Sequence, residues 1–173
     1  MKISKNNILK LSILLSLICF FSLNIFSNNT FNRISLDTTQ NNLYTISSGT
    51  EKFLKNIDEP IHLRLFMSST LVEIAPQLST YANRVESLLY SYANMSEGKI
   101  TLEIIDPKPF SDQEDRAVGM GISPFGGSNN NDPLYFGLAA TNSTTGQKNI
   151  NVFSPEREPF LEYDLTRLIA ELA

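Results

Sequence analysis

The sequence is poor in the residues that most often carry metal, redox or nucleophilic chemistry. Among its 173 residues there is one cysteine, one histidine and no tryptophan. Because Cys19 is alone, a disulfide within the chain, a dithiol redox pair and a cysteine-ligated zinc site are excluded. Because His62 is the only histidine, a metal site built from several histidines is excluded as well. The glycine-rich stretch 119–133 lacks both the G-K-[ST] of a phosphate-binding loop and the third glycine of a dinucleotide loop.

An excess of positive charge is also missing from most of the chain. The formal net charge is −4, but residues 1–33 hold four basic residues and no acidic one. The residues after position 33 hold 10 basic and 18 acidic side chains, which gives −8. Nucleic-acid phosphates bind to positive surfaces, so this acidic body argues against nucleic acid as a partner.

A long apolar run extends from residue 8 to residue 26. As a helix, these 19 residues would cover about 28 Å, close to the ~30 Å hydrocarbon core of a bilayer. Lys2 and Lys5 precede the run and only Arg33 follows it nearby, so the positive-inside rule places the N-terminus in the cytoplasm. We therefore expect residues 1–27 to form a cytoplasmic N-terminus and a single transmembrane anchor in a bacterial inner membrane, with the remainder in the periplasm.

Two other interpretations of this run are less favoured. A cleaved signal peptide usually ends at a small-x-small site, and the stretch SNNTFN after Phe26 has none. A buried core helix would need packing partners beside it, whereas polar, asparagine-rich residues follow. We expect residues 28–46 to be a tether and residues 47–173 to be the extracytoplasmic domain.

Within this domain, alternating apolar residues indicate strands and apolar residues at helical spacing indicate helices. The predicted strands are 61–67, 99–106, 134–142 and 147–154, and the predicted helices are 44–60, 73–98, 111–122 and 159–173. In the first helix, Ser47 is the expected N-cap. From the first strand onward the order is β-α-β-α-β-β-α. The first two strands should be parallel because a helix joins them, and the last two should form a hairpin, which predicts an α/β domain with a mixed sheet.

This order resembles the thioredoxin-like fold. A cis-proline commonly precedes the third core strand of that fold, and Pro133 stands at the matching place. The C-x-x-C motif expected after the first strand is absent, because FMSSTLVEIAP occupies that position. We therefore expect a thioredoxin-like mixed sheet without thiol–disulfide exchange.

An acidic patch at the start of the predicted helix 111–122 is the strongest candidate for a metal site. Ser111 and Glu114 have the S-x-x-E spacing of a capping box, in which the Ser oxygen accepts from the amide of Glu114 and the Glu reaches back to the N-cap amide. Asp112 and Asp115 then lie in the first turn, where the helix dipole favours anions. Capping explains the patch without a ligand, and nothing in it matches a calcium loop. No metal site is predicted.

His62 is the candidate that a Ser-His-Asp arrangement would have to use. Its strand alternates, so His62 and Arg64 should share a sheet face with Thr101 and Glu103 of the neighbouring parallel strand. We favour this structural interpretation over a catalytic one. The loop 119–133 is expected at the surface, as a partner contact or as the lip of a ligand site.

Three long stretches are similar to one family. They are SLDTTQNNLYTISSGTEKFLKNIDEPIHLRLFMS, YANRVESLLYSYANMSEGKITLEIIDPKP and FSPEREPFLEYDLTRLIAEL, and together they cover about residues 35–173. They resemble the GldG-type auxiliary component of ABC transport systems associated with gliding motility.

This resemblance implies a non-enzymatic, membrane-anchored accessory subunit of an ABC-2-type transport system. Its partners would be an ABC permease, the cytoplasmic ATPase of that permease and the bilayer around residues 8–26. The resemblance supplies no catalytic, cofactor-binding or metal-binding residue. Family members are usually longer, so the chain is expected to be a fragment or a truncated product. The alternative is a periplasmic module that binds a small ligand or carbohydrate.

Overall fold

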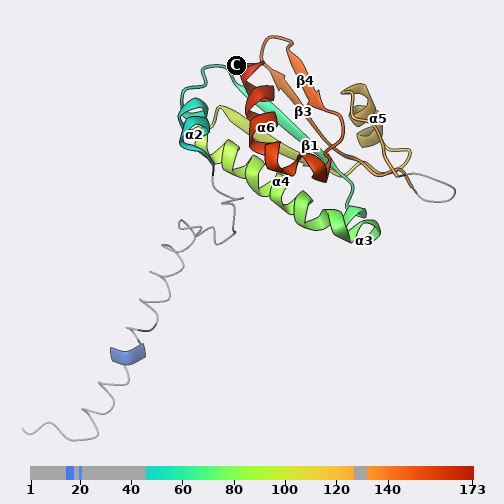
Figure 1. Ribbon diagram of the computed structural model, residues 1–173, viewed down its shortest axis with the longest axis horizontal. Coiled ribbons are helices and arrows are strands. Elements are labelled where there is room, and N and C mark those ends of the chain that lie inside the picture. The colour runs from blue at the N-terminus through green and yellow to red at the C-terminus, as the bar shows by residue number, and fades with distance from the viewer. Residues whose placement is uncertain (1–14, 18–19, 21–45, 127–131) are drawn as a thin grey trace, which may run out of the picture. The chain divides into compact units, whose positions relative to one another are not determined.

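The structure is a computed structural model that describes residues 15–17, 20, 46–126 and 132–173 (Figure 1). Of the predicted transmembrane run, only Leu15–Leu17 and Phe20 belong to this part, and they are helical and exposed. Among the described residues, no helix has the length and apolar character needed to cross a membrane. The expected anchor at residues 8–26 lies mostly outside the described residues and stays a prediction.

The domain after residue 46 contains a four-stranded mixed sheet with the strand order β2-β1-β3-β4. The strands are β1 (Ile61–Met67), β2 (Ile100–Ile105), β3 (Phe136–Asn142) and β4 (Gln147–Ile150). β1 is parallel to β2 and antiparallel to β3, and β3 is antiparallel to β4. The predicted mixed α/β architecture, with two parallel strands followed by a hairpin, is confirmed.

The last strand is shorter than predicted. The expectation of a strand over 147–154 is wrong beyond Ile150, where β4 ends. The chain bends there, and the amide of Phe153 rejoins the sheet by donating to the carbonyl of Phe136 at 2.8 Å. Phe153 is buried again, so the alternation of apolar and polar residues that suggested a longer strand continues past the end of β4.

The helices are α2 (Ser48–Lys55), α3 (Leu71–Ile74), α4 (Pro76–Met95), α5 (Asp112–Gly119) and α6 (Leu161–Ala170), with a 3-10 helix η1 (Pro155–Phe160) before α6. Ser47 is the N-cap of α2 as predicted, since its hydroxyl accepts from the amide of Thr50 at 3.3 Å. The predicted single helix 73–98 is wrong, because Ala75 leaves helical geometry immediately before Pro76. A residue that precedes proline is sterically disfavoured in the α conformation.

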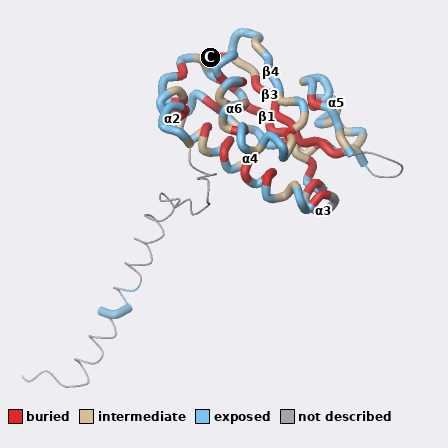
Figure 2. The backbone as a smooth tube through the Cα atoms, in the orientation of Figure 1, coloured by how far each residue is buried: buried red, intermediate tan, exposed pale blue. Residues whose placement is uncertain are grey.

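The larger apolar core lies on one face of the sheet, beneath α4 and α6 (Figure 1). β1 contributes Ile61, Leu63 and Leu65, all almost completely buried, and the buried stretches of the strands are visible in Figure 2. Tyr92 of α4 reaches through this core to the hydroxyl of Thr166 at 2.7 Å, which joins the two helices. Burial raises the pKa of Tyr92 well above its ordinary value, so its phenol stays protonated.

A smaller apolar cluster lies on the opposite face, where α5 covers one end of the sheet. It consists of Phe66, Ile105, Ala117, Ile122, Tyr135 and Ala139. The other end of this face carries polar side chains that no helix covers within the described residues. The peptide bond before Pro133 is trans, whereas the proline that precedes the third core strand of the thioredoxin-like fold is commonly cis. Trans is the ordinary state of an X-Pro bond.

Candidate functional site

The carboxyl ends of parallel strands are the usual ligand sites of α/β sheets, and those of β1 and β2 lie at the same edge of this sheet. Ser68 and Ser69 follow β1, Asp106 follows β2, and Tyr135 precedes β3. The amide of Ser69 donates to the carboxylate of Asp106 at 2.9 Å, which ties the two strand ends together. The hydroxyl of Ser68 accepts from the amide of Tyr135, so three separate segments meet at this edge.

Ser68 is the first residue after β1, and its polar groups are engaged by Tyr135, just before β3. It is 4% exposed, its hydroxyl accepts from the amide of Tyr135 at 2.9 Å, and its own amide donates to the Tyr135 carbonyl at 3.0 Å. A nucleophilic serine needs a base within hydrogen-bonding reach. His62 stands six residues earlier on β1, about 20 Å away at ~3.3 Å per residue. The Ser68 hydroxyl thus serves to fix the start of β3.

Glu114 of α5 connects this edge to the acidic patch. Its carboxylate accepts from the Tyr135 hydroxyl at 2.9 Å and from the amide of Phe110 at 2.6 Å. Burial, followed by the hydrogen bond to Glu114 and the negative charge of that group, raises the pKa of Tyr135 to about 12. The phenol of Tyr135 is therefore a permanent hydrogen-bond donor at physiological pH.

The predicted capping box is half correct. The hydroxyl of Ser111 accepts from the Glu114 amide at 3.3 Å, so Ser111 is the N-cap of α5. The Glu114 carboxylate does not return to the Ser111 amide, which donates instead to the Lys108 carbonyl at 3.2 Å. The carboxylate binds the amide of Phe110 because that residue adopts a left-handed conformation, with φ of 60°. Sequence spacing could not indicate this shift by one residue.

Asp112 and Asp115 lie in the first turn of α5, as predicted for residues that complement the helix dipole. Within the described residues, no group of three or more His, Cys, Asp or Glu side chains is arranged to hold a metal ion. The acidic patch forms the first turn of α5, and its Glu114 also accepts a hydrogen bond from the phenol of Tyr135.

His62 lies on the uncovered end of the α5 face, in the predicted register. β1 and β2 pair His62 with Thr101 and Arg64 with Glu103. The His62 Nδ1 lies 2.6 Å from the Thr101 hydroxyl, and the Arg64 Nε donates to Glu103 at 3.2 Å. The register prediction is confirmed.

The sequence did not indicate that a side chain of α5 would contact the polar residues on this face of the sheet. Arg116 donates to both carboxylate oxygens of Glu103, at 3.2 and 3.1 Å, so Glu103 lies between two guanidinium groups. Arg64 also donates to the hydroxyl of Thr141 on β3 at 3.0 Å. Because these ion pairs are largely exposed, each contributes at most about 1 kcal/mol.

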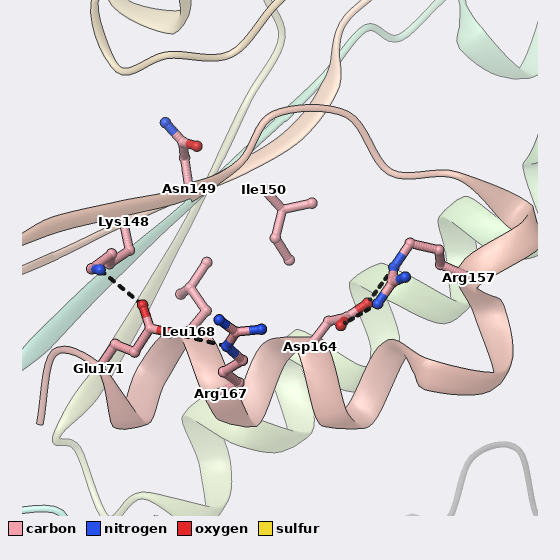
Figure 3. Close-up of a pocket in the computed structure, with 8 residues that line it drawn as sticks. All are labelled: Lys148, Asn149, Ile150, Arg157, Asp164, Arg167, Leu168 and Glu171. Atoms are coloured by element: carbon pink, nitrogen blue, oxygen red, sulfur yellow. Dashed lines mark hydrogen bonds and ion pairs between the residues drawn. The ribbon is translucent and has the colours of Figure 1, made fainter.

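A cleft of about 300 Å³ lies between β4 and the η1–α6 segment (Figure 3). Its lining residues are Lys148, Asn149, Ile150, Arg157, Asp164, Arg167, Leu168 and Glu171. Arg157 holds Asp164 through two hydrogen bonds of 2.9 and 2.7 Å. Sequence reasoning missed this site. The signal that could have pointed to it is the four-residue spacing of Arg167 and Glu171, which form an ion pair at the end of α6.

Glu171 joins the two sides of this cleft. Lys148 of β4 lies 2.8 Å from one of its oxygens, and the Arg167 Nε donates to the other at 3.0 Å. The hydrogen bonds from these two cations lower the pKa of Glu171 below its ordinary value.

A second hollow, of about 470 Å³, follows the outer edge of β2 toward α5. It is lined by Glu103, Ile104, Ile105, Asp106, Lys108, Gln113 and Arg116. Of the predicted surface loop 119–133, residues 127–131 lie outside the described residues. A role for that loop as a lip or partner contact stays a prediction.

A family model described as a domain of unknown function, DUF7088, matches residues 40–141. This stretch is more than half of the 173 residues, so the chain belongs to the DUF7088 family. No curated protein and no solved structure matches the chain. The matched region ends within β3, so the cleft between β4 and α6 lies outside it.

Proposed function

We propose that this member of the DUF7088 family is a non-enzymatic, membrane-anchored accessory subunit of an ABC-2-type transport system, of the GldG type associated with gliding motility. The observation that carries the proposal is the resemblance of three long stretches, which are distributed between residues 35 and 172. The apolar run 8–26 with its flanking lysines supports a bacterial inner-membrane anchor and a periplasmic domain.

We further propose that the domain has a thioredoxin-like fold. The strand order β2-β1-β3-β4, with a parallel β1–β2 pair and an antiparallel β3–β4 hairpin, supports this assignment. Two features depart from the usual pattern: the bond before Pro133 is trans, and Ser68 and Ser69 follow β1 where redox members have cysteines. The scaffold would then be retained without its redox chemistry.

A non-enzymatic role is supported by how the polar groups are engaged at the carboxyl edge. The hydroxyl of Ser68 is held by the backbone of β3, and the phenol of Tyr135 is held by Glu114. His62 lies at the opposite end of β1 and contacts Thr101. These side chains stabilise the edge, and none forms the nucleophile–base pair that covalent catalysis requires.

Purification in mild detergent tests the proposal. The full chain, expressed in its native host with an affinity tag, should recover an ABC permease and its ATPase in fixed proportion, identified by mass spectrometry. A tag on the permease should recover this chain in return. A variant whose residues 8–26 are replaced by an unrelated apolar span should retain the partners if the domain contributes to binding. Recovery of the tagged chain alone, in both directions, would refute the proposal.

A further inference from the structure

The cleft between β4 and α6 concentrates positive charge on an otherwise acidic domain. Three of the 10 basic residues that follow position 33 line it, namely Lys148, Arg157 and Arg167. Only two carboxylates, Asp164 and Glu171, line the same cleft. The cleft is therefore locally cationic by one charge, whereas the chain after residue 33 carries −8.

Arg167 has hydrogen-bonding capacity that its neighbours do not use. Its only hydrogen bond within the described residues is from Nε to Glu171, so both terminal NH₂ groups of the guanidinium are without a bonded acceptor. Figure 3 shows this guanidinium between Asp164 and Leu168, on the side of α6 that faces β4. A planar guanidinium with two open donors matches the geometry of a carboxylate.

The surroundings of the cleft have the composition of a protein-binding surface. Phe160 and Tyr163 are 57% and 63% exposed, although large aromatic side chains are usually buried. Arg157 lies 5.8 Å from the centre of the Phe160 ring and so connects this ring to the cleft. Aromatic and arginine side chains are enriched at protein interfaces and at the positions that dominate their energetics.

The edge strand β4 and the apolar residues that line the cleft suit an extended peptide. β4 is the terminal strand of the sheet, so the backbone groups on its outer side are not paired with another strand of the described sheet. Ile150 and Leu168 provide apolar surface between the charged groups. An extended segment beside β4 would direct alternate side chains toward α6.

We propose that this cleft binds an extended, acidic peptide segment of a partner protein, with a carboxylate on Arg167 and Lys148 and an apolar side chain on Ile150. A single carboxylate suits the local excess of one positive charge. A multiply charged free anion such as phosphate suits it less, because Asp164 and Glu171 lie in the same cleft. The inference does not depend on the transport role proposed above.

The test uses the ¹⁵N-labelled full chain in detergent, titrated with the peptide acetyl-TETVT-amide, whose single Glu and its Val two residues later lie on the same side of an extended strand, and followed by NMR. We expect the amide signals of residues 147–151 and of α6 to shift. Arg167→Gln should weaken binding about tenfold, because it removes a charge-assisted hydrogen bond. Arg116→Gln is the matched control: it removes an ion-paired arginine on the opposite sheet face and should leave the affinity unchanged.

Two further titrations complete the test. Acetyl-TKTVT-amide and inorganic phosphate, at the same concentrations, should not shift the β4 signals. The proposal is overturned if the acidic peptide produces no shift at β4, if the lysine peptide or phosphate produces the same shifts, or if Arg167→Gln and Arg116→Gln have equal effects.

Discussion

The two faces of the sheet are built from the same strands but are covered very differently. On the face beneath α4 and α6, apolar residues extend along the whole length of β1, from Ile61 to Leu65. On the α5 face, apolar packing is confined to the end near Phe66, and the other end carries His62 and Arg64. The first face contributes most of the buried apolar surface of the domain, whereas part of the second face is a polar surface that solvent can reach.

This difference follows from the lengths of the covering helices. α4 has 20 residues and extends about 30 Å, which is enough to span β1 completely. α5 has eight residues and extends about 12 Å, roughly half the length of β1. The strand positions that the α5 backbone does not cover are open to water and carry polar or charged side chains, and Arg116 of α5 extends to Glu103 among them.

Truncation of one core residue on each face measures the difference directly. Leu89 of α4 is completely buried, so Leu89→Ala should lower the free energy of unfolding by about 2–5 kcal/mol. Ile105→Ala, on the α5 face at the edge strand β2, should cost about 2 kcal/mol because its surroundings are more open. Urea denaturation monitored by circular dichroism gives both values. An equal or larger loss for Ile105→Ala would contradict the contrast between the faces.

Gly137 tests how closely the chain after β4 packs on the α5 face. A Cβ at this position would lie 2.4 Å from the Asn151 carbonyl oxygen and 2.9 Å from that of Ile150. Gly137→Ala should therefore destabilise the domain by about 1–3 kcal/mol, because backbone has to move. Gly119→Ala is the control, since no atom lies within 4 Å of its Cβ. Thermal unfolding of the two variants should separate them, and equal melting temperatures would show that the bend after β4 is not tightly constrained.

The tyrosines of the two faces have similarly raised pKa values for different reasons, and a substitution at Glu114 distinguishes them. The pKa of Tyr81 rises to about 12 through burial and then the charge of Glu158, and that of Tyr135 rises to about 12 through burial and then Glu114. A phenol with a raised pKa in the folded state contributes stability that is complete below pH 10 and is lost as pH rises toward 12. Glu114→Gln should lower the pKa of Tyr135 and leave that of Tyr81 unchanged.

Ionisation of individual tyrosines can be followed by NMR of their ¹³Cζ signals as pH rises. If Glu114→Gln moves both tyrosines equally, or neither, then Glu114 does not act through the hydrogen bond to Tyr135. Glu158→Gln provides the reciprocal variant, which should affect Tyr81 alone.

The smallest effect is expected at the polar end of the α5 face. His62 is exposed and contacts Thr101, so His62→Ala should change the free energy of unfolding by less than about 0.5 kcal/mol. If the proposed accessory role is correct, recovery of the permease and ATPase should also be unchanged. A large loss of stability, or loss of a chemical activity, would show that this face does more than the structure indicates.

The sequence by itself determined the local features of this domain. β1 was predicted residue for residue because its alternating pattern is uninterrupted. The caps at Ser47 and Ser111 were predictable because a cap joins a side chain to an amide three residues away. The pairing of Arg64 with Glu103 followed because opposite charges at matching positions of two parallel strands indicate one register.

Tertiary structure alone decided which distant groups meet. The partners of Glu114 include Tyr135, 21 residues away, and Lys148 reaches Glu171 from another element. The cleft arises only because the chain bends after Ile150 and returns α6 across the sheet. The physical reason is the range of the interactions. Caps and alternation depend on atoms a few residues apart. The cleft depends on the packing of distant elements, which forms only when the apolar burial of the whole domain outweighs the entropy lost in ordering the chain.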